Sequence, residues 1–194
     1  MTRIAMLALS KWAHFSWLPR GERARTARAE ARANADLLAR FASLAALRTP
    51  PALPPFALLP RPACAKVLRV AAALAHARSL RRIVSAQAQR RFGILIAPRV
   101  LHVIQRDARG LRANAEARAP LDVLDRTAMT AAGLAIALRT LDDPALRVLM
   151  QLRMPYAVAQ RAERFGVDRA DNMRIDAARD LLDNAYALVT EEAC

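Results

Sequence analysis

The sequence predicts an all-α protein, and three observations lead to that prediction. The chain has 194 residues with only five glycines, and it is rich in alanine, leucine and arginine, which favour helices. Runs of valine, isoleucine and threonine alternating with polar residues, which would indicate strands, are missing. Prolines and capping residues divide most of the chain into segments of helical length. We therefore expect one compact multi-helix domain over residues 1–194, with an extended Pro-rich strap near residues 49–62.

The first third of the chain predicts a short element and a long helix. Residues 1–19 form an amphipathic element ending at Pro19; it either packs at the periphery of the domain or waits for a partner. Its aromatic residues, Trp12, Phe15 and Trp17, are of the kind that anchors a core or an interface. Residues 21–48 predict one long helix whose face of small residues is expected to be buried, namely Ala24, Ala27, Ala31, Ala35, Leu38, Ala42 and Ala45.

The segment TPPALPPFALLPRP, residues 49–62, holds six of the eleven prolines. Proline opposes a regular helix, so polyproline-type extension is expected. Phe56 and the leucines are too apolar for a solvated linker between two domains. The segment is therefore interpreted as a strap packed across the helical body.

Further helices follow the strap. One begins near Pro62 and continues, directly or through a bend, towards Gly93. The others are expected over residues 98–110, 121–141, 156–166 and from about 173 to the end. In the last helix, the side chains expected to point inward are Met173, Ala177, Leu181, Ala185 and Leu188.

The stretch LDDPALRVLMQLRMP, residues 141–155, predicts a short buried helix. Asp143 is placed to cap its N-terminus, Pro144 suits the first helical position, and Pro155 ends it. A helix that is apolar nearly all round is buried on several sides. A core helix is the main interpretation, and docking to a partner is the alternative.

Charge is distributed unevenly along the sequence. The formal net charge is +14, and 29 of the 31 basic residues are arginine. Residues 49–118 carry 13 basic and two acidic side chains, whereas residues 119–194 carry nine basic and 12 acidic ones. A basic region of this kind suits an acidic partner, an anionic membrane surface or nucleic acid. The few aromatic residues do not interleave with the arginines, so stacking platforms for single strands are not predicted.

No catalytic, cofactor or metal site is predicted. The three histidines, His14, His76 and His102, lie far apart, and no carboxylate or thiol stands at ligand spacing from them. Glycine-rich phosphate loops and nucleophile motifs are absent from the sequence. Cys64 and Cys194 form no disulfide framework, which fits a reducing cytoplasm. The longest uncharged stretches fall short of a membrane span.

One basic segment stands out as a candidate partner contact. In SLRRIVSAQAQRR a continuous helix would place Arg78, Arg81, Arg82, Ser85 and Gln89 on one face, and Arg90 and Arg91 extend the charge. A solvated face is the simpler interpretation, but no acidic residue separates these arginines. We therefore interpret Arg78, Arg81, Arg82, Arg90 and Arg91 as a partner-binding patch suited to carboxylates or phosphates.

Several segments together resemble a known family. The order HFSWLP, an Arg/Ala helix, the strap, AAALAHARSLRRIVSAQAQRRF and DRTAMTAAGLAIALRTLDDPALRVLMQLRMP resembles the K subunit of the type III secretion sorting platform, the SctK or YscK family of Hrp type. The likeness covers roughly residues 12–160, and its most recognisable pieces are GLAIAL at 133–138 and LRMP at 152–155.

The resemblance implies a cytoplasmic, non-catalytic adaptor. It would bridge an SctD-like inner-membrane ring protein to an SctQ-like platform protein, with no cofactor, no small-molecule substrate and no nucleic acid, and would meet the membrane only indirectly. The alternative from the residues is a basic nucleic-acid-binding or regulatory module.

Overall fold

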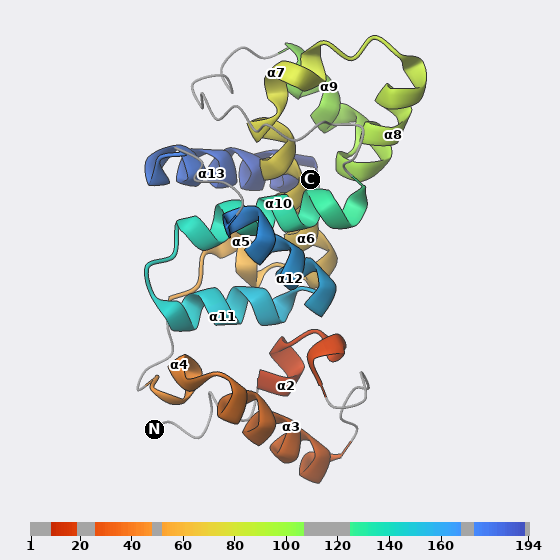
Figure 1. Cartoon of the computed structure of the whole chain (residues 1–194). Helices are drawn as coiled ribbons and strands as arrows, with labels where there is room; N and C mark the ends of the chain where they lie inside the picture. Colours follow the sequence, from red (N-terminus) through yellow and green to blue (C-terminus); the bar gives the residue numbers. More distant parts are fainter. Residues whose placement is uncertain (1–8, 19–25, 48–51, 107–124, 168–172, 193–194) are drawn as a thin grey trace.

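The structure is a computed structural model that describes residues 9–18, 26–47, 52–106, 125–167 and 173–192. Within these ranges every regular element is a helix, which confirms the all-α prediction. Three groups of helices follow one another along the long axis of the molecule (Figure 1).

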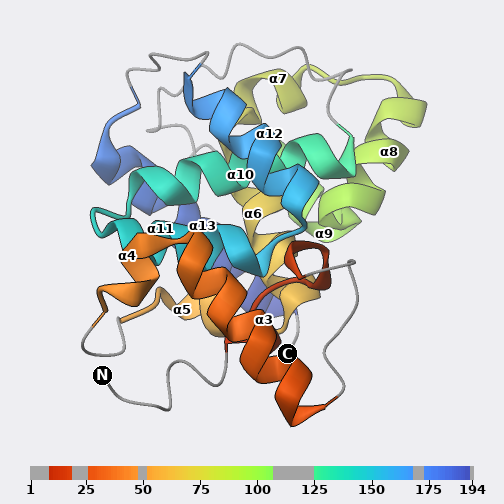
Figure 2. The same cartoon turned by 60° about the horizontal axis from the view of Figure 1, so that its bottom comes forward.

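The first group lies at one end and comes from the N-terminal part of the chain. It consists of α2 (Leu9–Trp12), a 3-10 helix η1 (Phe15–Trp17), α3 (Ala27–Arg40) and α4 (Ala42–Ala45). Figure 2 shows α3 lying across this end of the molecule. Thr26 caps α3 by accepting a hydrogen bond from the Ala29 amide.

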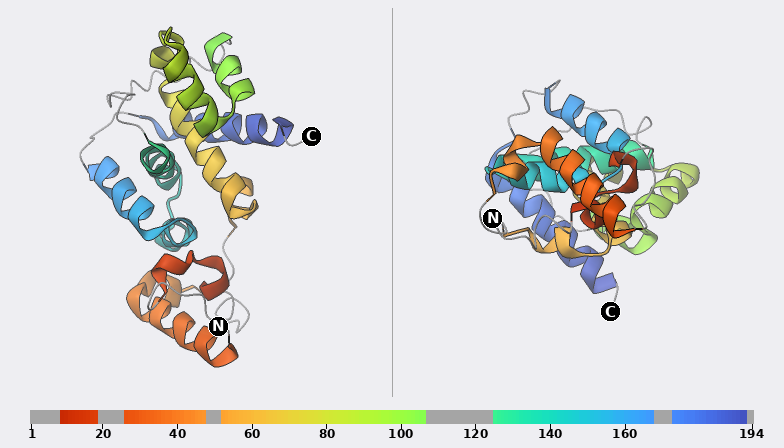
Figure 3. Two further views of the ribbon diagram at one scale, coloured as in Figure 1. Left: turned by 90° about the vertical axis from the view of Figure 1, so that its right-hand side faces the viewer. Right: turned by 90° about the horizontal axis from the view of Figure 1, so that it is seen from below.

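The second group forms the middle of the molecule. Its helices are α5 (Pro55–Leu58), α6 (Arg61–Ala75), α10 (Arg126–Arg139), α11 (Pro144–Arg153), α12 (Tyr156–Val167) and α13 (Ile175–Glu192). Helix α10 packs against α6 and α12, and α13 crosses α6. The left view in Figure 3 shows α6 running lengthwise, from the N-terminal layer towards the opposite end.

The third group stands at the far end of α6. It consists of α7 (Ala77–Arg81), α8 (Ala86–Ile96) and α9 (Pro98–Arg106), and we call residues 77–106 the α7–α9 tip. Helices α7 and α8 both pack against α9. Pro98 opens α9 at the N-terminal position that tolerates proline.

The described buried apolar side chains form one contiguous cluster, which extends from Leu9 to Val189. Its centre is α10, where Met129, Ala131, Leu134 and Ala137 are fully buried. At Gly133 an added Cβ would lie 1.9 Å from the Leu68 carbonyl oxygen. Glycine therefore allows the backbones of α10 and α6 to approach closely. The number of domains stays a prediction.

Helix α11 matches the sequence interpretation. The Asp143 side chain accepts a hydrogen bond from the Ala145 amide at 2.8 Å, and Pro144 occupies the first turn. Leu149, Met150 and Leu152 are buried. The prediction of a core helix closed by Pro155 is confirmed.

The long helix expected over residues 21–48 is wrong in two respects. It is broken at Phe41, which has non-helical backbone angles and packs edge-on against Trp17 with ring centroids 5.9 Å apart. Its buried residues include Ala33, Asn34 and Leu37, whereas Ala31 and Ala35 are exposed. Burial of the polar Asn34 side chain is possible because it accepts a hydrogen bond from the Ser10 amide. The spacing of apolar residues along the sequence gives no sign of this contact.

The Pro-rich strap is extended over a shorter range than predicted. Residues 52–54 lack regular structure, but Pro55–Leu58 form α5, because proline suits the first position of a helix as well as an extended chain. Residues 49–51 lie outside the described ranges. Phe56 and Ala57 are buried and Leu53 and Leu59 pack against the core, so the strap lies on the body, with Leu58 exposed.

Other boundaries also differ from the expected ones. The helix expected from Pro62 to Gly93 is divided at His76 and at residues 82–85, and α8 continues through Gly93 to Ile96. Helix α10 begins at Arg126, after the Asp125 cap, and not at Leu121, which lies outside the described ranges together with Gly110. In α13, Leu181 and Ala185 are buried as expected, whereas Ala177 and Leu188 are half-buried, and Ala178, Leu182 and Val189 share the inner face.

Candidate interaction surface

The described residues contain no group of three or more histidine, cysteine, aspartate or glutamate side chains that could hold a metal ion. His14 lies at the N-terminal group, His76 is buried between α6 and α7, and His102 is exposed on α9. None of the described helices is both long and apolar enough to cross a membrane.

The predicted arginine patch does not lie on one continuous helix. Arg78 and Arg81 belong to α7, Arg82 ends it, and Arg90 and Arg91 belong to α8. Residues 83–85 between the two helices are not helical. The single helical face that was expected to carry Arg78, Arg81, Arg82, Ser85 and Gln89 is thus absent, because tertiary packing of α7 and α8 on α9 replaces helix continuity.

Arg81 holds the tip together. Its Nε donates a hydrogen bond to the Ile104 carbonyl at 3.0 Å, and Gln105 Nε2 donates to the Leu80 carbonyl at 3.4 Å, so α7 and α9 are joined in both directions. Its side chain is half-buried, whereas Arg78, Arg82, Arg90 and Arg91 are exposed. We therefore assign Arg81 a structural role and leave the other arginines as contact candidates.

The base of the tip is tied to α6. Arg69 Nε donates to the Leu95 carbonyl at 2.7 Å. Burial, followed by the nearby charge of Arg126, lowers the pKa of Arg69 from its ordinary value. Gln89 Nε2 donates to the Ile83 carbonyl at 3.2 Å and ties the 82–85 segment back onto α8. These bonds fix the outer surface of the tip in one arrangement.

The outer surface of the tip is basic and partly apolar. Residues 77–106 contain seven arginines and no acidic residue. Val84 is 89% exposed in the segment between α7 and α8, and Ile94 is 74% exposed on α8. Sequence reasoning placed Val84 opposite the arginines on a continuous helix and did not single out Ile94, because the exposure of both side chains depends on how α7 and α8 fold onto α9.

A second surface has the opposite charge. Helix α13 carries five acidic residues and one arginine, and Asp176, Asp180, Asp183 and Glu191 are exposed. The Arg174 and Asp176 side chains form an exposed ion pair at 3.5 Å. The molecule thus presents a basic and an acidic surface on different helices.

The aromatic segment around Trp12 and Trp17 meets the segment LRMP, residues 152–155, in space. The indole of Trp12 donates to the Leu149 carbonyl and that of Trp17 to the Met154 carbonyl, each at 2.8 Å. The His14 amide donates to the Leu152 carbonyl at 2.6 Å. We call this contact of residues 11–17 with residues 149–156 the N-terminal clamp. It answers the open question about residues 9–18, which pack on the body, while residues 1–8 lie outside the described ranges.

The half-buried guanidinium group of Arg61 and the buried one of Arg153 complete the N-terminal clamp. Arg61 Nη2 donates to the carbonyls of Lys11 and Trp12 at 2.7 Å, and also to that of Ala13. Arg153 lies over the Trp12 ring at 4.2 Å and donates to the Leu59 carbonyl of the strap. Both arginines thus donate to backbone carbonyls and tie residues 11–13 and the strap to the body.

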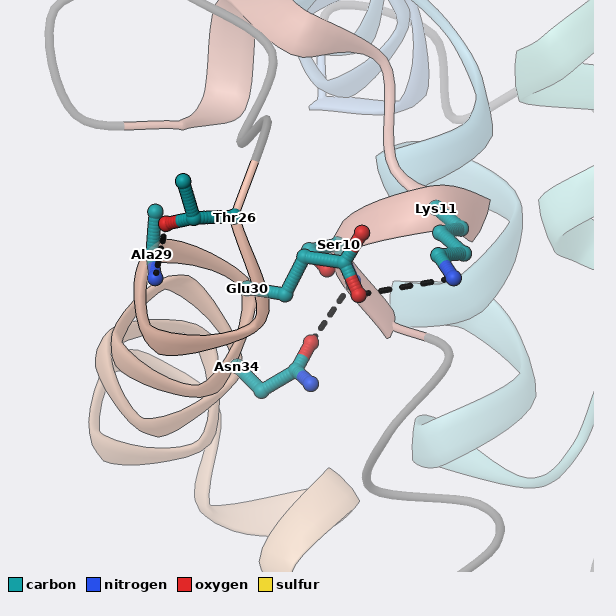
Figure 4. Close-up of polar contacts among 6 residues, drawn as sticks. All are labelled: Ser10, Lys11, Thr26, Ala29, Glu30 and Asn34. Carbon is teal, nitrogen blue, oxygen red and sulfur yellow. Dashed lines mark hydrogen bonds and ion pairs between the residues drawn. The ribbon is translucent and has the colours of Figure 1, made fainter.

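The clamp is also fixed from the side of α3 (Figure 4). The Asn34 side chain accepts the Ser10 amide at 2.8 Å, and Lys11 pairs with Glu30 at 3.4 Å. Asn34 is buried, so its hydrogen bond specifies how α2 sits on α3. These contacts hold α2 on α3.

One comparison with known proteins gave a match. The family model described as YOP proteins translocation protein K (YscK) matches residues 3–192. No curated protein and no solved structure matched the chain. The matched range includes the α7–α9 tip, the N-terminal clamp and α13.

Proposed function

Because the chain belongs to the YscK family of type III secretion proteins, we propose that it is a non-catalytic adaptor of a secretion apparatus. It joins the cytoplasmic domain of the SctD-like inner-membrane ring protein to the SctQ-like platform protein. It acts in the cytoplasm, at the inner-membrane base of the apparatus.

The observation that carries this proposal is the pair of oppositely charged surfaces on one packed helical body. Residues 77–106 of the tip contain seven arginines and no acidic residue, and the outer face of α13 presents carboxylates. Surfaces of opposite sign select different partners, because like charges disfavour the wrong pairing. Two such surfaces suit a protein that holds two different neighbours at once.

The helices that join the two charged surfaces are closely packed, which supports the same role. Helix α13 crosses α6, and the tip continues from the end of α6, so both surfaces are attached to one central helix. The close approach of α10 to α6 at Gly133 stiffens that centre. A bridge of this kind transmits position from one partner to the other.

The proposal is tested by co-purification with the ring and platform subunits of the same apparatus. The tagged full chain should capture each subunit alone and both together in one complex. Replacing Arg78, Arg82, Arg90 and Arg91 with glutamate should weaken capture of one subunit, while circular dichroism stays unchanged. Arg81 is left intact in this variant because it joins α7 to α9. Capture of neither subunit by the wild-type chain would contradict the adaptor role.

The charged residues of the tip are all arginines, and this also supports a second candidate function, the binding of nucleic acid. This function predicts that the logarithm of the affinity for a 20-bp duplex falls linearly with the logarithm of the salt concentration. Absence of binding in a fluorescence anisotropy titration at 50 mM NaCl would exclude it.

A further inference from the structure

We propose that the outer side of the α7–α9 tip is a docking face for an acidic protein surface that carries apolar side chains. Val84 and Ile94 are its apolar contacts, and Arg82 and Arg90 are its charged contacts. This inference rests on the adaptor function and defines the chemistry of one of the two partners.

The apolar contacts are two large aliphatic side chains that the protein leaves in water. Val84 is 89% exposed and Ile94 is 74% exposed, although the same tip buries Phe92, Leu95 and Ile96. On α8, Ile94 follows Arg90 by four residues and Gln87 by seven, so the three share one exposed strip of the helix. Each exposed apolar side chain therefore has an arginine near it in the chain, Arg82 before Val84 and Arg90 one turn before Ile94, and arginine is among the residues enriched at the energetic centre of protein–protein interfaces.

The docking face is held in shape before a partner binds. Gln89 fixes the carbonyl of Ile83 beside Val84, and Arg69 fixes the carbonyl of Leu95 beside Ile94. Arg81 fixes α7 on α9. Ordering these backbone segments therefore costs little on association, which favours affinity.

The charge of the face determines the charge of its occupant. Arg82 and Arg90 are exposed, and no acidic residue occurs anywhere in residues 77–106. A partner that is acidic around an apolar centre would complement both properties. The exposed carboxylates of α13 would repel such a partner, so of these two described surfaces the basic tip is the one that suits it.

Other classes of occupant fit the face less well. Phe92 is the one Phe, Tyr or Trp in residues 77–106, and it is buried, so no aromatic side chain is available for stacking on bases. A helix that lies on a lipid surface carries its apolar side chains on the face opposite its basic ones, whereas α8 exposes Ile94 and Gln87 in the same strip as Arg90. Glutamine and arginine both donate directional hydrogen bonds to carboxylates and carbonyls of a protein.

The experiment measures binding of the full chain to each of the two subunits by calorimetry. The variants are Ile94→Asp, Val84→Asp and the pair Arg82→Glu with Arg90→Glu.

Leu58→Asp is the matched apolar control, because Leu58 is 64% exposed on α5, outside the tip. Arg32→Glu is the matched charge control, because Arg32 is exposed on α3. Melting curves of all variants establish that the fold is retained.

We expect Ile94→Asp to weaken binding of one subunit by about 30-fold, as at a buried interface anchor. The arginine pair should weaken the same subunit, and its effect should shrink at high salt because charge attraction is screened. Binding of the other subunit and both control variants should stay within about threefold of wild type. A benzophenone side chain at position 94 should cross-link to an acidic segment of the affected subunit.

Two results would overturn the inference in different ways. If the wild-type chain binds both subunits and the tip variants bind them equally well, the docking face is wrong and the adaptor function stands. If the wild-type chain binds neither subunit, both the adaptor function and the docking face are wrong. Tip variants that lose binding only to vesicles of phosphatidylglycerol and phosphatidylcholine, or only to duplex DNA, would show that the occupant belongs to another class.

Discussion

Gly133 sets the distance between the two central helices. A Cβ at this position would lie 1.9 Å from the Leu68 carbonyl oxygen and 2.4 Å from the Leu68 carbonyl carbon, so backbone would have to move. We expect Gly133→Ala to lower the free energy of unfolding by about 3 kcal/mol, at the upper end of overpacking effects. Urea denaturation followed by circular dichroism measures this change.

Gly93 provides the matched comparison. It also lies inside a helix, but its added Cβ would meet Pro98 Cγ at 3.5 Å, an ordinary contact. Gly93→Ala should therefore raise stability by about 0.5–1 kcal/mol, the usual gain from replacing a helical glycine with alanine. Equal effects of the two substitutions would contradict the close approach of α10 to α6.

The Cys64 thiol makes the free energy of unfolding depend on pH in the alkaline range. The thiol is buried, and burial raises its pKa from 9.0 to about 11, although the charge of Arg153 partly offsets the shift. Between these values the unfolded thiol loses its proton and the native one keeps it, so stability falls as pH rises and is fully present below pH 9.

The measurement compares the unfolding free energies of the Cys194→Ser chain and of its Cys64→Ala derivative. Their difference should be constant up to about pH 9 and then shrink by about 1.4 kcal/mol per pH unit until about pH 11. Parallel curves over this range would show that Cys64 ionises normally in the folded chain.

The docking of η1 on α11 depends on the indole of Trp17. This side chain is buried, donates to the Met154 carbonyl at 2.8 Å and meets the Tyr156 ring edge-on at 4.8 Å between centroids. Trp17→Phe keeps most of the ring but leaves the carbonyl without this donor. We expect a loss of about 1–3 kcal/mol in unfolding free energy, and faster hydrogen exchange in residues 9–18.

Phe15→Leu is the control for this substitution, because Phe15 is exposed on the same 3-10 helix. Its effect should stay within about 0.5 kcal/mol. A Trp17→Phe chain as stable as wild type would show that the clamp depends on its other hydrogen bonds alone.

Helix boundaries were predictable where local chemistry sets them. Asp143 and Pro144 start α11 as expected, because a carboxylate cap and a first-turn proline act within a few residues. The breaks at Phe41 and at residues 82–85 were not predicted, because distant packing decides them: Phe41 meets Trp17, and α7 and α8 fold onto α9. Helix propensity alone favours continuation at both places.

Across the whole molecule, the sequence located the basic region but not its shape. The absence of acidic residues near Arg82 and Arg90 could be read directly from the chain. The structural role of Arg81 and the exposure of Ile94 depend on how α7 and α8 pack on α9, so they needed coordinates. Family resemblance pointed to residues 152–155 without explaining them, and the N-terminal clamp now supplies a physical reason for that segment.

The N-terminal clamp also constrains how the chain reaches its folded state during synthesis. Trp12 and Trp17 each bond a carbonyl 137 residues further along, and the ribosome reaches those carbonyls about 7–30 seconds after the indoles, at about 5–20 residues per second. Until then both indoles lack their acceptors, so a nascent chain carries exposed aromatic side chains for most of its translation. We therefore expect closure of this end to be among the late events of folding, with chaperones meeting the aromatic segment first.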